Sequence, residues 1–418
     1  MTLLLKSATI LDADQPDLHG KKQDLLIEKG VITRIGRQLK APAGSREIRL
    51  ENLHVSAGWV DTGVSFGEPG HEERETVAHG LEVAAGSGFT AVILNPDTKP
   101  LPDTSGDIVF LKDLARNSLC ELFPAGTLSK ASEGSDLAEL FDMQGAGAVT
   151  FHDYKTPVAN PNLLRLALEY AQGFGGLVQS FPMDAALGHN GQMHEGAVSV
   201  RLGLRGIPGL SEELQVVRDL AILEYTGGKL HIPLVSTARA VKHISDAKKR
   251  GLDVSCSVAI HNLAFSDANL EAFESRYKVL PPLRPQAECN ALIKGLSSGV
   301  IDFVTSDHNP RDIEEKRLEF DRAAFGTLGL EAAFGTLNRL LGSERAIDLL
   351  TRGRKRFGLP EVKLAEGQKA CLTLFNPDGE REFTRHDIRS TATNCLYVGA
   401  RVKGNVYGVI RGGKTNIR

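Results

Sequence analysis

Short apolar segments alternate with amphipathic segments through the middle of the chain, from residue 55 to residue 361. The apolar segments are short enough for buried strands, and they include TAVILNP, CELFPAGT, GAVTFHD, DVSCSVAI and IDFVTSDHNP. The segments between them carry apolar residues at the spacing of helices that pack one face on a sheet, as in NPNLLRLALEYAQG and SEELQVVRDLAILEYTGG. About eight such units favour an α/β fold of the (β/α)8 barrel type. A doubly wound sheet is the alternative, but no GxGxxG motif follows the early strands, so nucleotide binding has little support.

Both ends of the chain alternate apolar and polar residues with a period of two, which predicts strands. The pattern is clear in LLLKSATIL and DLLIEKGVITRIG near the start, and in KACLTLFNP and NCLYVGARVKGNVYGVIRGG near the end. Because chain termini often lie close together, we expect both ends to assemble into one small β-sandwich domain. The predicted boundaries are residues 1–54 with 362–418 for this composite domain, and residues 55–361 for the barrel.

Composition excludes several classes of protein. Hydrophobic residues make up 41% of the chain and the net charge is −3, so there is no basic excess for nucleic acid or an anionic membrane. No apolar run approaches the roughly 18 residues that span a bilayer. The start of the chain has no basic segment before a long apolar stretch, and the five cysteines form no CxxC pair. We expect a cytoplasmic protein. The basic runs at 248–250 and 352–356 are interpreted as solvated helix ends.

Catalytic groups of such a barrel collect at the carboxyl ends of its strands. The first barrel strand ends in VDTGVSFGEPG, where Gly63 and Ser65 share one face because side chains alternate along a strand. A metal-dependent hydrolase would need histidines at such positions, and neither residue is a usable zinc ligand. The last strand ends in TSDHNP, which places Asp307 at the same edge of the barrel.

Ordered sequence blocks over nearly the whole chain resemble the dihydroorotases of the amidohydrolase superfamily. They include VDTGVSFGEPGHEERETVAHGLEVAAGSGFTAVILNPDTKPLPD, YKVLPPLRP, IDFVTSDHNPRDIEEKRLEF and GTLGLEAAF. The resemblance implies a metal-dependent (β/α)8 barrel with a small β domain built from both chain ends, and a place in pyrimidine biosynthesis. This expected fold agrees with the one that the periodicity predicts.

The chain departs from the family pattern at the functional positions. The resemblance implies metal-binding histidines at four positions that here hold Gly63, Ser65, Phe181 and Leu234. It implies polar substrate contacts, an arginine, two asparagines and a histidine, at positions that here hold Gly67, Asp97, Leu280 and Arg311. Only Asp153 and Asp307 keep ligand-type side chains, and in the family the second is also the general base. Two carboxylates cannot build a tetrahedral zinc site, so we predict no metal and no cofactor, with Asp307 as a vestigial catalytic residue.

The remaining histidines near strand ends could in principle build a rearranged metal site, and they are His152, His231, His261 and His308. His231 and His308 adjoin positions expected to face the lumen, so alternation should turn their side chains away from it. We therefore favour structural roles for them.

Three functions are compatible with these observations. The leading hypothesis is a catalytically inactive structural subunit, because the chain resembles non-catalytic dihydroorotase-like proteins that assemble with the aspartate transcarbamoylase catalytic subunit; a homo-oligomer is also expected. The second is a hydrolase of dihydroorotate or another cyclic amide with Asp307 as base, assisted by Asp97, Asp153 or Arg311. The third is a small-molecule binding module at the barrel mouth, which Gly63 and Ser65 would enlarge and apolar side chains would line.

Overall fold

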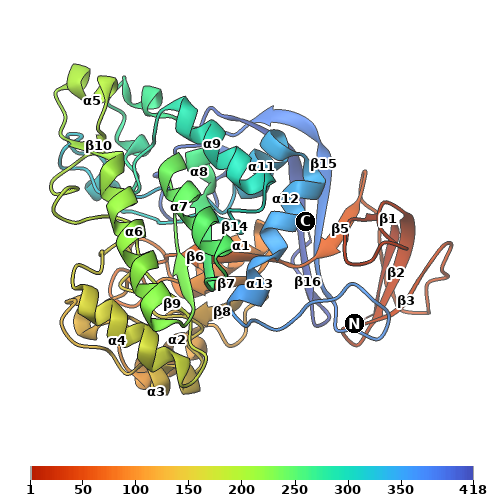
Figure 1. Cartoon of the computed structure of the whole chain (residues 1–418). Helices are drawn as coiled ribbons and strands as arrows, with labels where there is room; N and C mark the ends of the chain where they lie inside the picture. Colours follow the sequence, from red (N-terminus) through yellow and green to blue (C-terminus); the bar gives the residue numbers. More distant parts are fainter. Residues whose placement is uncertain (1, 418) are drawn as a thin grey trace.

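Parallel strands form a barrel ringed by helices, and a sheet made from both chain ends lies beside it (Figure 1). These features come from a computed structural model that describes residues 2–417. The barrel is closed by the segment around Phe151, which bridges to Gly126 and Val178, and by seven strands: β6 (Trp59–Val64), β7 (Phe89–Leu94), β8 (Glu121–Pro124), β9 (Val178–Gln179), β12 (Leu230–Ile232), β13 (Val254–Ala259) and β14 (Phe303–Thr305).

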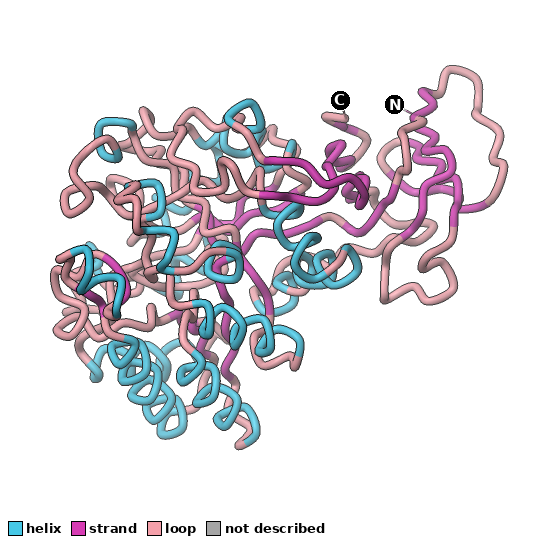
Figure 2. The backbone as a smooth tube through the Cα atoms, turned by 90° about the horizontal axis from the view of Figure 1, so that it is seen from above, coloured by secondary structure: helices cyan, strands magenta, loops and turns pink. Residues whose placement is uncertain are grey.

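The barrel strands are buried because both of their faces are covered. β7 and β13 are buried along their whole length, which explains why they are continuous apolar or small-residue runs rather than alternating ones. Their outer faces pack on the helices, and their inner faces form a core at the bottom of the barrel that includes Val60, Ile93 and Phe303. Figure 2 shows the strands surrounded by helices.

The helices follow the predicted pattern. Asn160 caps α4 by accepting a hydrogen bond from the amide of Asn162, and Pro161 occupies its first turn. The helices are α1 (Val77–Gly86), α2 (Ser105–Leu114), α3 (Leu140–Ala146), α4 (Pro161–Gln172), α5 (Ala197–Leu202), α6 (Gly209–Thr226), α7 (Ala238–Lys249), α8 (Ile260–Ala264), α9 (Gln286–Ser297), α10 (Ile313–Lys316), α11 (Ala333–Leu341), α12 (Ser343–Thr351) and α13 (Gly353–Arg356). Within the described part of the chain, none of them has the length and apolarity needed to span a membrane.

The sheet of the chain ends has the order β17-β16-β15-β5-β1-β2-β3, with β4 paired to β1. Its members are β1 (Thr2–Ile10), β2 (Lys22–Glu28), β3 (Val31–Gly36), β4 (Arg46–Ile48), β5 (His54–Ala57), β15 (Cys371–Glu382), β16 (Arg401–Arg411) and β17 (Lys414–Thr415). A separate small pair joins β10 (Met193–His194) to β11 (Gly206–Ile207). The predicted fold class, a (β/α)8 barrel with a small β domain formed by both chain ends, is confirmed. The strands of the two ends form one continuous sheet rather than the two packed sheets of the predicted β-sandwich.

Trp59 connects the end sheet to the barrel. Its ring is buried and packs on Phe89, Phe334 and Phe375, which come from β7, α11 and β15. Its indole N–H donates to the hydroxyl of Ser56 at 2.9 Å, so the one polar atom of the ring is satisfied. This contact fixes the start of β6, and therefore the position of the strand end that follows.

Candidate functional site

The ends of β6 and β14 are tied together by a buried aspartate. One carboxylate oxygen of Asp61 accepts hydrogen bonds from the Thr305 hydroxyl at 2.6 Å and from the Gly63 amide at 3.1 Å. The other accepts from the Ser306 amide at 3.0 Å, and burial raises the pKa of Asp61. A Cβ at Gly63 would lie 3.4 Å from the Thr305 hydroxyl and 3.6 Å from the Asn95 side chain. A Cβ at position 63 would therefore make ordinary van der Waals contacts with these two side chains.

The segment after β6 is buried at Ser65 and sterically restricted at Gly67. Ser65 is buried and accepts a hydrogen bond from the Asn95 side chain at 3.3 Å. Gly67 has a φ of 131°, and a Cβ there would collide with the carbonyl oxygen of His71. No arginine can occupy position 67 with this backbone. Nearby Asp97 is half-buried, and its burial raises its pKa although the Ser65 hydroxyl and Arg311 lower it.

Lys155 lies against Asp307, a pair that the sequence analysis did not identify. The lysine Nζ is 2.8 Å from Asp307 Oδ2, and the two side chains are only 10% and 3% exposed. Burial raises the pKa of Asp307 to about 6, although the ammonium group of Lys155 lowers it. One sequence feature could have suggested that Lys155 lies near the strand ends. Asp153 and Lys155 are two residues apart, so in a regular strand their side chains would share one face. Tyr154 lies between them with a φ of 52°, which is not an extended conformation, so the two side chains do not share one face.

Asp153 points into a neighbouring loop and not toward Asp307. One of its carboxylate oxygens accepts from the amides of Leu128 and Ser129 at 2.9 and 3.0 Å, and the other accepts from the Ser129 hydroxyl at 2.6 Å. It does not line the cavity at the strand ends, whereas Asp307 does. The two retained acidic residues are therefore not brought together, and Asp153 orders the loop after β8.

Several positions where the family resemblance implies polar side chains carry apolar ones here, and these pack into one cluster. Phe181 and Leu234 pack with Ala259 as a buried cluster, and Met183 and Leu280 pack against it. The cavity between these and the neighbouring side chains has a volume of about 20 Å³, comparable with the space for a single water molecule. The expectation of an enlarged binding cavity at the barrel mouth is therefore wrong, because the side chains around the small residues close the space.

His231 faces the barrel interior, against the expectation from alternation. Its ring nitrogens lie 2.9 and 3.1 Å from the hydroxyls of Ser255 and Ser257, and it lines the same small cavity as Leu234. The alternation fails because β12 ends at Ile232 and Leu234 has a φ of 56°. Two hydroxyl partners give this histidine a structural role.

The other three histidines are also buried. His308 accepts hydrogen bonds from the amides of Gly329 and Leu330 at 3.2 and 3.4 Å, so its ring faces away from the lumen. His152 and His261 form no hydrogen bond with any described residue, and burial lowers the pKa of each to about 3. His261 Nε2 lies 3.9 Å from Asp307 Oδ2, so a neutral imidazole adjoins the ion pair.

Comparisons with known proteins identify the family. A family model described as Dihydro-orotase-like matches residues 54–240. The dihydroorotase of Anaeromyxobacter dehalogenans (strain 2CP-C) is 38% identical over 399 residues, which cover 93% of this chain and 92% of that protein. The dihydroorotase of Pelotomaculum thermopropionicum is 36% identical over 421 residues, or 99% and 98% of the two chains. This chain belongs to the dihydroorotase family.

Solved structures with low sequence identity share the fold. The L-hydantoinase (dihydropyrimidinase) of Arthrobacter aurescens superposes with a TM-score of 0.85 at 21% identity, over 99% of this chain and 95% of that one. The D-hydantoinase of a Thermus species gives a TM-score of 0.83 at 23% identity, over 100% and 95%. The dihydroorotase-family chain therefore has the barrel architecture of these enzymes.

The metal centre that the family resemblance implies does not fit the residues of this dihydroorotase-family chain. Among residues 2–417, no group of three or more His, Cys, Asp or Glu side chains is arranged to hold a metal ion. Asp307 already has the Lys155 ammonium group as its counter-charge, and Asp153 is held by backbone amides. Two of the expected ligand positions carry the apolar side chains Phe181 and Leu234, which offer no donor atom.

Proposed function

We propose that this dihydroorotase-family chain does not hydrolyse dihydroorotate and acts as a structural subunit. The observation that carries the proposal is the packing of Phe181, Leu234 and Leu280 into one apolar cluster at positions where the resemblance implies metal-binding and substrate-binding groups. Opening a cyclic amide needs an activated water and a polarised carbonyl oxygen. Apolar side chains supply neither, and a polar substrate placed against them would lose hydrogen bonds to water without replacement.

We propose the aspartate transcarbamoylase catalytic subunit as the partner, together with self-association of the chain. The support for this partner is the resemblance to non-catalytic dihydroorotase-like subunits. A protein that keeps an intact barrel frame without the family's catalytic groups retains surfaces through which it can assemble.

The first test is turnover of dihydroorotate together with metal content. We expect protein purified without chelators, and then dialysed against zinc, to hold far less than one zinc per chain. We expect no hydrolysis of dihydroorotate, and no formation of it in the reverse reaction, above a reaction without protein. A dihydroorotase with 38% identity, prepared in the same way, is the positive control. About two tightly bound zinc ions per chain, or turnover, would contradict the proposal.

A hydrolase with an altered site is the second candidate function. Two observations favour it: relatives that are 38% and 36% identical to this chain are named dihydroorotases, and Asp307 is a buried carboxylate at the strand ends beside a cavity. If a cyclic amide is turned over, Asp307→Asn should abolish the activity. Asp153→Asn is the matched control, because the carboxylate of Asp153 binds a loop and does not line the cavity. Turnover that is lost in Asp307→Asn and kept in Asp153→Asn would establish this hydrolase function in place of the structural role.

A further inference from the structure

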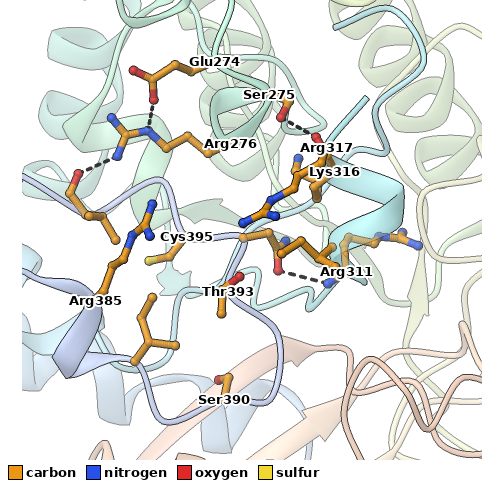
Figure 3. A pocket seen from close by; sticks show the side chains of 14 residues that line it. Glu274, Ser275, Arg276, Arg311, Lys316, Arg317, Arg385, Ser390, Thr393 and Cys395 are labelled. Carbon is orange, nitrogen blue, oxygen red and sulfur yellow. Dashed lines mark hydrogen bonds and ion pairs between the residues drawn. The ribbon is translucent and has the colours of Figure 1, made fainter. Parts of the chain in front are cut away.

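A pocket rich in arginine lies outside the strand-end site. It is formed by η3 (Ser275–Tyr277), by the segment that contains α10, and by residues 385–398, and its volume is about 600 Å³. We call it the cationic pocket and define it by Arg276, Arg311, Lys316, Arg317, Arg385 and Thr393 (Figure 3). It shares no lining residue with the cavity beside Asp307, so it is a separate site.

The charges that line the cationic pocket do not balance. Four arginines and one lysine line it together with a single carboxylate, that of Glu274. Just outside the lining, Glu315 lies 3.9 Å from Arg311 Nη1. Glu274 is already paired with the Arg276 guanidinium, which also donates to the Val398 carbonyl at 2.7 Å. Like charges held in one concavity repel one another, and a bound anion would relieve that repulsion.

Two guanidinium groups at the pocket are available to a ligand. Among the residues that the structure describes, Arg317 and Arg385 have no hydrogen-bond or ion-pair partner for their side chains. Figure 3 shows them reaching into the pocket from opposite sides, Arg317 from the α10 segment and Arg385 from the segment after β15. Arg311 is committed elsewhere, because its Nε donates to the Phe325 carbonyl at 3.0 Å. Guanidinium forks match the oxygens of a phosphate group.

The buried wall of the pocket includes Lys316, whose amine is bound by backbone carbonyls. Lys316 is 5% exposed, and its Nζ donates to the carbonyls of Ala324, Gly326 and Lys278 at 2.8, 3.0 and 3.3 Å. Among residues 2–417 it forms no ion pair with a carboxylate. Burial, with the nearby charges of Arg311 and Lys278, lowers the pKa of Lys316 to about 7. An anion in the pocket would favour the charged form of this lysine.

We propose that the cationic pocket binds a phosphorylated small molecule, with the phosphate between Arg317 and Arg385. The apolar lining residues Ile313, Ile388 and Val398 provide a surface for the organic part of the ligand. The volume lies within the range of about 300 to 1,000 Å³ that is usual for small-molecule pockets. An excess of positive lining charge favours a dianionic phosphate ester over a neutral ligand. The proposal does not rest on an activity at the strand ends, although the charge of Arg311 also acts on Asp97 there.

Calorimetric titration of the full chain with adenosine monophosphate tests the proposal, with adenosine as the ligand that lacks the phosphate. We expect the monophosphate to bind and adenosine not to bind. We expect Arg317→Gln and Arg385→Gln each to weaken binding by about tenfold or more. Arg339→Gln is the matched control, since Arg339 is an exposed arginine that does not line the pocket, and it should leave the affinity unchanged.

The proposal is wrong if neither inorganic phosphate nor adenosine monophosphate binds at millimolar concentration. It is also wrong if adenosine binds as tightly as the monophosphate, or if Arg339→Gln weakens binding as much as the two pocket variants do. Arg317 and Arg385 are exposed, so both glutamine variants should fold. Equal melting temperatures for all three variants verify this point.

Discussion

Lys155 determines the electrostatics of the strand ends, because its ammonium group is the positive charge that faces Asp307. A buried carboxylate without a counter-charge is much more costly than a paired one. Burial raises the pKa of Asp307 to about 6, and the lysine counteracts a larger rise. The pair places a cation on one carboxylate oxygen, Oδ2, while Asp307 still lines the small cavity at the strand ends.

At the residue scale, we expect Lys155→Met to lower the free energy of unfolding by about 3 to 5 kcal/mol at about pH 8, because it leaves Asp307 buried and unpaired. In this variant the pKa of Asp307 in the folded state rises further above its ordinary value of 3.8. The folded state then holds the proton more tightly than the unfolded chain, so stability is lost as pH rises above about 4. Urea unfolding at about pH 5 and about pH 8 measures the difference, with the larger loss at the higher pH.

The double variant Lys155→Met, Asp307→Asn is the matched control, since asparagine does not ionise. Its loss of stability should be nearly the same at both pH values. If Lys155→Met alone also lost the same amount at both, the assigned pairing would be incorrect.

At the scale of elements, α13 is hydrogen-bonded to the bottom of the barrel through Arg354. Arg354 of α13 is 9% exposed, and its Nη2 donates to the Gly58 carbonyl at 3.2 Å and to the Thr90 hydroxyl at 2.8 Å. These acceptors lie just before β6 and in β7, so one side chain connects a late helix to two early barrel strands. The interpretation of residues 352–356 as a solvated helix end is wrong for this arginine, because only the fold brings Gly58 and Thr90 to it.

We expect Arg354→Met to lower the free energy of unfolding by about 2 to 3 kcal/mol, since it leaves two buried acceptors without a donor. Arg352→Met is the control from the same basic run, because Arg352 pairs at the surface with Asp348 and should change stability by about 0.5 kcal/mol or less. Thermal and urea unfolding of the two variants test this. Equal effects would mean that the buried contacts of Arg354 contribute nothing beyond a surface ion pair.

At the scale of the whole molecule, the barrel frame is complete while its strand ends are closed by their own side chains. The described chain keeps the closed barrel and the sheet from both ends. A closed mouth of about 20 Å³ leaves the outer surfaces as the parts through which the molecule can act on others. This is the physical reason for proposing an assembly role.

We expect this chain and the aspartate transcarbamoylase catalytic subunit of the same organism to co-elute as one species larger than either alone. Size-exclusion chromatography with light scattering on an equimolar mixture measures this, and an unrelated protein of similar size replaces the partner as control. Two independent elution peaks at concentrations well above those in the cell would count against the proposed partner.

The sequence by itself determined the barrel, the assembly of strands from both chain ends and the chemical identity of the side chains at the strand ends. Periodicity and motif order are properties of neighbouring residues, so they can be analysed without coordinates. The same holds for the apolar side chains at positions 181, 234 and 280, whose packing into one cluster agrees with their chemistry.

Only the tertiary structure decided which side chains meet. The positive φ of Tyr154 brings Lys155 and not Asp153 to Asp307, and the end of β12 at Ile232 turns His231 inward. The cationic pocket combines segments that lie more than a hundred residues apart, from η3 to residues 385–398. Alternation holds only within a regular strand, and long-range contacts depend on the path of the whole chain; for these physical reasons the sequence could not predict them.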